Sequence, residues 1–195
     1  MPFPKLLYRA FTDLCHAQQF VDEGRFRIGR LDKYRTVENA ARVDSSEGLG
    51  HYVDADGISE HFEFGNAIYI LCCSSENVDL AVLRRKMGPF VIQINDPEQL
   101  ACDIAAFLHE NNVKLFGEIQ CRMFSYTKGK ANIAKLDAME RAELSIVQKP
   151  PFFEEECEQR LYTIINTQCP VPLMTLDIGI NLERPLPYVE ILSGL

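Results

Sequence analysis

Acidic and basic side chains alternate late in the chain, where residues 152–165 have the sequence FFEEECEQRLYTII. Because successive side chains of a β-strand point to opposite faces, this spacing predicts one face that carries Glu156, Glu158, Arg160 and Tyr162. Such a face could present two carboxylates to a cleft, where the adjacent like charge tends to raise the pKa of one of them and the neighbouring arginine tends to lower it. The same alternation is typical of a sheet face that is open to water, so the pattern supports both interpretations.

A second charged cluster lies early in the chain, where residues 34–48 have the sequence YRTVENAARVDSSEG. If this segment is helical, Arg35, Glu38 and Arg42 share one face. Two arginines beside Tyr34 would suit a diphosphate and a flat ring, because a guanidinium holds phosphate through two hydrogen bonds. A surface network of ion pairs fits the same residues. A divalent cation is a third interpretation, although the spacing matches no regular calcium loop. Its ligands would be Glu38, Asp44 and Glu47.

Two serines, Ser74 and Ser75, follow the apolar run AIYILCC of residues 67–73. Serine is common at helix N-caps, so the pair predicts the start of a helix; alternatively, its hydroxyls would orient a strand or a ligand. The four histidines are isolated and indicate no Ser-His-Asp triad, and neither a G-x-G-x-x-G nor a Walker loop occurs. The seven cysteines form no C-x-x-C pair, so neither a zinc ribbon nor a redox motif is indicated.

The elements that position these residues follow from the apolar periodicity, which predicts about eight to ten strands and three or four helices. The predicted strands are 5–11, 25–31, 58–64, 67–73, 89–95, one or two within 113–126, 158–165, 173–180 and 186–192. The predicted helices begin at Thr12, at Ser74 or Ser75, at Asp96 and near Asn132, and the first two end at Gly24 and Gly88. Because strands and helices do not alternate strictly, we expect an α+β fold.

Composition limits the classes of function. The length of 195 residues predicts a single domain over residues 1–195. Acidic residues outnumber basic ones by 28 to 20, which argues against general nucleic-acid binding. Five basic residues nevertheless lie within residues 25–35. This segment is interpreted either as a solvated edge strand or as part of a local basic pocket. Since no leader and no apolar run of membrane-spanning length is apparent, we expect a cytoplasmic protein that does not enter a membrane.

Three features occur in a telling order: Arg9 on the first strand, the serines after an apolar strand, and the late Glu156-x-Glu158. This order resembles the Arg…Ser…Glu-x-Glu layout of the ADP-ribosyltransferase superfamily. The opening, a strand, a short helix and a glycine turn into a second strand, is similar to that of the DarT-like toxins and the RNA 2′-phosphotransferases. The whole chain resembles an uncharacterised bacterial or phage branch of the superfamily. It departs from the pattern at Cys73-Ser74-Ser75, where Ser-Thr-Ser or a similar motif is expected.

The resemblance implies a mixed, mostly antiparallel split sheet and a protein that uses NAD as its substrate, with no metal. It implies glycosyl transfer to an unknown macromolecular acceptor, or hydrolysis of NAD, in a toxin or in a phage or host defence factor. The implied catalytic residues are Glu158 and, second, Glu156. The implied residues around the dinucleotide are Arg9, Tyr34, Arg35, Glu38, Arg42, Tyr69, Ser74, Ser75 and Arg160.

Two other classes of function remain open at this point. An acidic protein can act without catalysis, as an interaction or inhibitor protein that covers a partner's basic surface. A metal-dependent nuclease would use the carboxylates of the early cluster, although the chain offers no extended basic path for its substrate.

Overall fold

The computed structural model describes residues 2–35, 49–53, 59–63, 68–123, 146–147, 151–166 and 177–193. Within these residues there are ten strands, three α-helices and two short 3₁₀ helices. In chain order they are β1 Leu7–Phe11, α1 Leu14–Glu23, β2 Arg25–Arg30, η1 Leu31–Arg35, β3 Leu49–Val53, β4 Ser59–Glu63, β5 Ile68–Ser75, α2 Leu80–Met87, β6 Phe90–Ile94, α3 Pro97–Glu110, β7 Gln120–Met123, η4 Pro151–Glu156, β8 Glu158–Ile164, β9 Asp177–Asn181 and β10 Val189–Leu192. The prediction of an α+β fold is confirmed.

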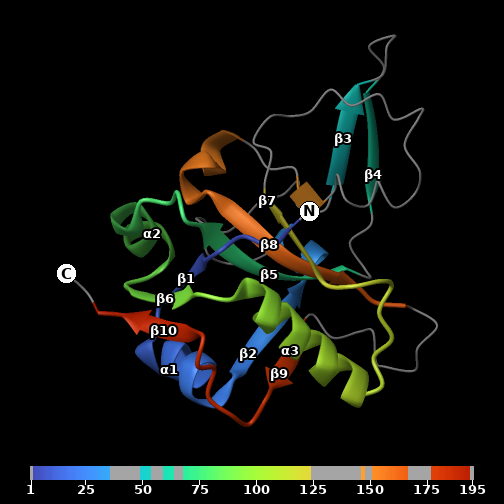
Figure 1. Ribbon diagram of the computed structural model, residues 1–195. Helices are drawn as coiled ribbons and strands as arrows, with labels where there is room; N and C mark the ends of the chain where they lie inside the picture. Colours follow the sequence, from blue (N-terminus) through green and yellow to red (C-terminus); the bar gives the residue numbers. More distant parts are fainter. Residues whose placement is uncertain are drawn as a thin grey trace.

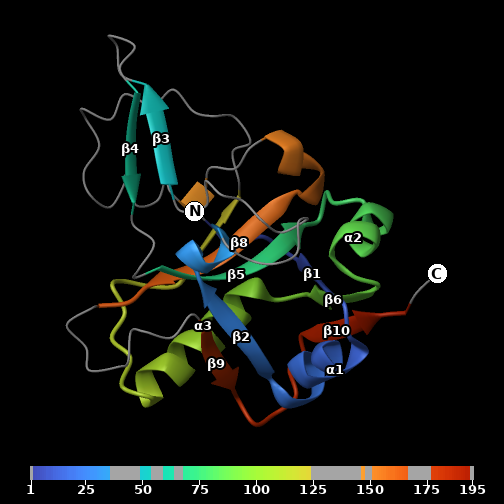
Figure 2. The same cartoon turned by 180° about the vertical axis from the view of Figure 1, so that it is seen from behind.

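Eight of the strands form one sheet in which each described pairing is antiparallel. The order is β10-β6-β1-β5-β2-β9, with β8 added to β5 and β7 added to β8 (Figure 1). The remaining two strands, β3 and β4, pair with each other as a separate ribbon that stands apart from the large sheet in both views (Figures 1 and 2). A mostly antiparallel sheet was expected and is confirmed.

Strand β5 is the branch point of this sheet. Along one edge it pairs with β8 over residues 68–74. Its other edge is shared: β1 pairs with Ser74 and Ser75, whereas β2 pairs with Tyr69 and Ile70. Strands β1 and β2 therefore diverge between these two contacts, and residues 71–73 have no strand partner on this edge. The divergence opens the sheet beside β5.

Helices cover both faces of the sheet. Alternation along β1 directs Leu7 and Phe11 to the main core cluster, which includes residues of α1 and α3. Tyr8 and Ala10 point to the opposite face and pack with Leu83 of α2. Apolar side chains therefore pack on both faces of the sheet.

The helix boundaries agree with the sequence where aspartate and glycine set them. Gly24 takes a left-handed conformation at the end of α1, and Gly88 ends α2, as predicted. Asp96 caps α3 by accepting from the Gln99 amide at 2.9 Å, also as predicted. The predicted cap at Thr12 is wrong by one residue, because the Asp13 carboxylate accepts the Cys15 amide proton instead.

Two further expectations are corrected. Ser74 and Ser75 do not cap a helix, because they are the last two residues of β5 and are buried. Asp79 caps α2 instead, by accepting a hydrogen bond from the Ala81 amide. The basic strand β2 is not an edge strand, because it pairs with β5 on one side and with β9 on the other. The predicted helix near residues 132–145 lies outside the described residues. No helix of the described part is long and apolar enough to cross a membrane.

Candidate functional site

A cavity of about 110 Å³ lies where β1, β5 and β8 meet the short helices η1 and η4. Six residues that the sequence singled out line it together. They are Arg9, Tyr34, Ser74, Glu156, Glu158 and Arg160. These residues come from five different elements, so only the folded sheet brings the early arginine next to the late carboxylates.

The strand register explains why the charged residues of β8 share this cavity. Directly opposite residues of an antiparallel pair lie on the same face. Glu158 is opposite Ser74, and Arg160 is opposite Cys72. The predicted alternation along β8 is therefore confirmed for Glu158, Arg160 and Tyr162, which pairs with Ile70 on that face.

The charged face of β8 is buried, contrary to the interpretation of a strand face open to water. Arg160 is 1% exposed and Glu158 is 4% exposed. The Arg160 Nε donates to Glu158 Oε1 at 2.7 Å, and its Nη1 donates to the carbonyl of Ile146 at 3.1 Å. Removing either partner would leave the other charge buried without its counter-ion, which costs far more stability than breaking an exposed ion pair. The ion pair fixes the position of the Glu158 carboxylate at the cavity wall.

Glu156 reaches the cavity from a turn rather than from the strand. The sequence predicted it on β8, but it ends the 3₁₀ helix η4 and is 4% exposed. The chain then passes through Cys157, whose φ of 44° reverses its direction before β8 begins. The Cys157 carbonyl accepts the Ser75 amide proton at 2.8 Å, which ties this turn to the end of β5. Both carboxylates consequently face one cavity, although they do not follow strand periodicity.

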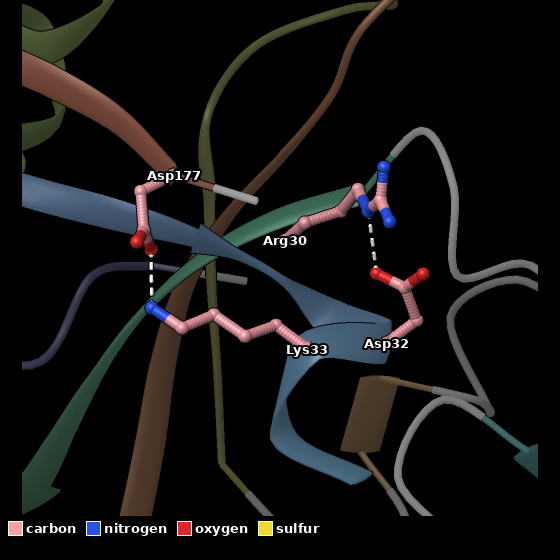
Figure 3. A network of polar contacts seen from close by, with 4 residues as sticks. All are labelled: Arg30, Asp32, Lys33 and Asp177. Carbon is pink, nitrogen blue, oxygen red and sulfur yellow. Dashed lines mark hydrogen bonds and ion pairs between the residues drawn. The ribbon is translucent and has the colours of Figure 1, made fainter. Parts of the chain in front are cut away.

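Tyr34 forms another part of the wall, and ion pairs hold the helix that carries it. Arg30 Nε contacts Asp32 Oδ1 at 2.6 Å, and Lys33 Nζ contacts Asp177 Oδ1 of β9 at 2.5 Å (Figure 3). These contacts anchor η1 to β2 and β9 through Asp32 and Lys33, the two residues that precede Tyr34. Burial raises the pKa of the Tyr34 phenol well above its ordinary value, so the hydroxyl remains a hydrogen-bond donor at neutral pH.

Arg9 occupies the opening between β1 and β2. Its Nη1 donates to the carbonyl of Cys72 at 2.5 Å, in the stretch of β5 that lacks a strand partner on this edge. Its guanidinium carbon lies 5.4 Å from the centre of the Phe11 ring, a cation–π contact. The guanidinium thus donates to a carbonyl that has no strand partner on this edge, and it also lines the cavity.

Cys73, one of the two thiols that line the cavity, is buried. Burial raises the pKa of Cys73 to about 12, against the smaller opposing effect of Arg9. Since the thiolate is the reactive form of cysteine, this thiol is inert at neutral pH. The carboxylates of Glu156 and Glu158, rather than this thiol, are the candidate groups for chemistry in the cavity.

The other residues predicted around a dinucleotide do not line this cavity in the described structure. Tyr69 is 1% exposed in the main core cluster, and Ser75 is buried opposite Leu7. Arg35 ends η1, and its side chain lies outside the description, as do Glu38 and Arg42 altogether. The acids of the alternative metal site also lie outside it, and no metal-binding group of three or more ligand residues occurs in the described residues.

Several wall residues were not predicted from the sequence. They are Tyr8, Ala10, Cys72, Cys73, Leu83 and Met87. Their only signal would have been alternation along β1 and β5 combined with knowledge of which helix covers that face. They add apolar surface to a cavity that also contains charged groups, a combination that is common in sites for small molecules.

No protein-family model matches the chain, and neither the curated proteins nor the solved structures contain a match to it.

Proposed function

We propose that the chain binds NAD at this cavity and breaks the bond between nicotinamide and ribose, as an ADP-ribosyltransferase does. The observation that carries the proposal is the convergence of Arg9, Tyr34, Ser74, Glu156 and Glu158 on one cavity. Residues with these chemical roles are spread over most of the chain, so their proximity is a property of the fold. The apolar surface of the cavity would receive the nicotinamide ring.

In the proposed reaction the C–N glycosidic bond breaks and its electron pair leaves with nicotinamide. The ribose becomes positively charged at its anomeric carbon, as in other glycosyl transfers. The Glu158 carboxylate, held by Arg160, would stabilise this charge at low cost because its orientation is already fixed. An acceptor hydroxyl or water would then form the new bond and lose its proton to Glu156, the second carboxylate that lines the cavity.

The proposal is tested by following nicotinamide release from NAD by chromatography. We expect the wild-type protein to release nicotinamide and Glu158→Gln to lose at least roughly a hundredfold of that rate. Glu118→Gln is the matched control, because Glu118 is exposed and lies outside the cavity. Both variants are first compared with wild type by urea unfolding, so that a loss of folded protein is not read as a loss of catalysis.

Two results would contradict the proposal at different levels. Unchanged release by a folded Glu158→Gln variant would remove Glu158 from the mechanism. The absence of both nicotinamide release and any NAD-induced rise in the melting temperature of the wild-type protein would refute the NAD assignment itself.

A further inference from the structure

A larger groove, of about 690 Å³, adjoins the cavity, and Arg9 lines both. It lies between β1, α1, β2 and β9, in the opening of the sheet beside β5. Besides Arg9, it is lined by Arg25 and Arg27 of β2 and by Gly179 and Asn181 of β9. The groove therefore extends the opening away from Glu158 and towards the basic strand.

The pairing of β2 with β9 gathers positive charge along this groove. Arg25 is opposite Asn181, and Arg27 is opposite Gly179. Both arginines therefore lie on one face of the sheet, and the glycine beside Arg27 adds no side chain to that face. Arg25 is half-exposed, with Glu23 at 3.0 Å, and Arg27 is exposed. No aspartate or glutamate is among the described residues that line the groove. In a protein of net charge −8, this is a local site of the opposite sign that would attract an anion.

Two buried polar atoms of the groove residues have no hydrogen-bond partner within the described part of the chain. They are Nε of Arg9 and Oδ1 of Asn181. A buried donor or acceptor that is left unpaired costs free energy, so each of these atoms would gain from a partner such as water, an ion or a polar ligand. The donor suits a phosphate oxygen, and the acceptor suits a hydroxyl or an amino group.

We propose that this groove is a binding site for a phosphorylated ligand of the sugar-phosphate or nucleotide class. The phosphate groups contact Arg25, Arg27 and Arg9, and a neighbouring hydroxyl donates to Asn181. Two sources share this chemistry: the adenosine-diphosphate half of a dinucleotide bound at the adjoining cavity, or a separate phosphorylated molecule. The proposal does not depend on cleavage of NAD, because it rests on the groove residues alone.

Gly179 allows the groove to be blocked without disturbing the fold. No atom lies within 4 Å of a Cβ built at this position, and its backbone conformation is open to other residues. Gly179→Glu would place a negative charge among the arginines, whereas Gly179→Gln has the same size without the charge. The pair therefore separates filling of the groove from electrostatic repulsion.

The experiment measures binding of ADP and of inorganic pyrophosphate by isothermal titration calorimetry. We expect both to bind wild type, and the Arg25→Gln/Arg27→Gln double variant to bind them roughly tenfold to a hundredfold more weakly, as for the loss of charged hydrogen bonds. Gly179→Glu should weaken binding more than Gly179→Gln. Lys114→Gln, which removes an exposed positive charge outside the groove, should bind like wild type.

The proposal is overturned if wild type binds neither probe, or if the double variant binds them as tightly as Lys114→Gln does. Competition distinguishes the two sources: displacement of pyrophosphate by NAD supports the dinucleotide, and simultaneous binding supports a separate molecule. Glu158→Gln should keep its affinity for ADP even if it loses NAD cleavage, so the two proposals can fail independently.

Discussion

A glycine on β2 determines where the Tyr34 ring can lie. A Cβ at Gly29 would stand 2.7 Å from Oη of Tyr34, and 3.1 Å and 3.2 Å from Cε2 and Cζ of the same ring. The backbone conformation of Gly29 is itself open to alanine. The three atoms nearest to that Cβ all belong to Tyr34, so the conflict that Gly29→Ala creates falls on a side chain of the cavity wall.

The expected size of the effect follows from two opposing contributions. Overpacking a well-filled site costs about 1–3 kcal/mol, and the lower half of this range applies because the nearest atoms belong to the end of a side chain that can rotate. Replacing glycine by alanine also restricts the unfolded chain, which stabilises by about 0.4–1 kcal/mol. We expect Gly29→Ala to lower the free energy of unfolding by about 1 kcal/mol in the wild-type background. In a Tyr34→Ala background the same change should be neutral or stabilising.

The assay is a double-mutant cycle measured by urea unfolding, with the slope checked for constancy so that midpoints can be compared. A coupling of about 1–2 kcal/mol between the two positions is expected, because the overpacking contribution is lost when Tyr34 is removed. An equal loss of unfolding free energy in both backgrounds, within about 0.5 kcal/mol, would show that Gly29 does not constrain the Tyr34 ring. If the Tyr34 wall contributes to ligand binding, Gly29→Ala should also reduce the NAD-induced rise in melting temperature.

Two further predictions concern the buried groups beside this wall. Arg160→Met should lower the free energy of unfolding by about 3–5 kcal/mol, since it leaves the Glu158 carboxylate buried without the guanidinium that pairs with it. The double variant Arg160→Met/Glu158→Leu should recover much of that loss. Equal urea midpoints for the single and double variants would contradict this prediction. The second prediction is a loss of stability in alkaline solution: the pKa of the Cys73 thiol rises from 9.0 to about 12 on folding, so its contribution is complete below pH 9.0 and is lost as the pH rises towards 12. Cys73→Ala should flatten the plot of unfolding free energy against pH by up to about 1.4 kcal/mol per pH unit, and an unchanged slope would show that the thiol is not shielded.

Local signals in the sequence predicted most of the elements. Asp96, Pro97 and Gln99 mark the start of α3 through interactions within one turn, and the structure contains that cap. Ser74 and Ser75 misled for the opposite reason, because contacts distant in sequence decide their state. Pairing with β1 and β8 draws both serines into β5, and the helix begins only at Asp79.

The candidate site was predictable in its residues but not in its environment. Alternation gave the shared face of Glu158 and Arg160, since strand geometry is local. It could not give their burial, because Ile146, Tyr34 of η1 and Leu83 of α2, which complete the surroundings of that face, come from other parts of the chain. The edge assignment of β2 failed likewise: its exposed arginines are typical of an edge, yet β9 arrives from the far end of the chain to pair with it.

The opening beside β5 explains why one arginine belongs to both the fold and the site. A strand edge with unpaired carbonyls is costly when it is buried, and here β1 and β2 diverge before either reaches Cys72. The guanidinium of Arg9 supplies the missing donor from a side chain, which fixes it in place without help from a ligand. A guanidinium carries five N–H donors, so satisfying this carbonyl leaves others available, including the unpaired Nε. The cation that repairs the sheet is therefore held rigidly at the junction between the carboxylate cavity and the basic groove, where an anion bridging the two would need it.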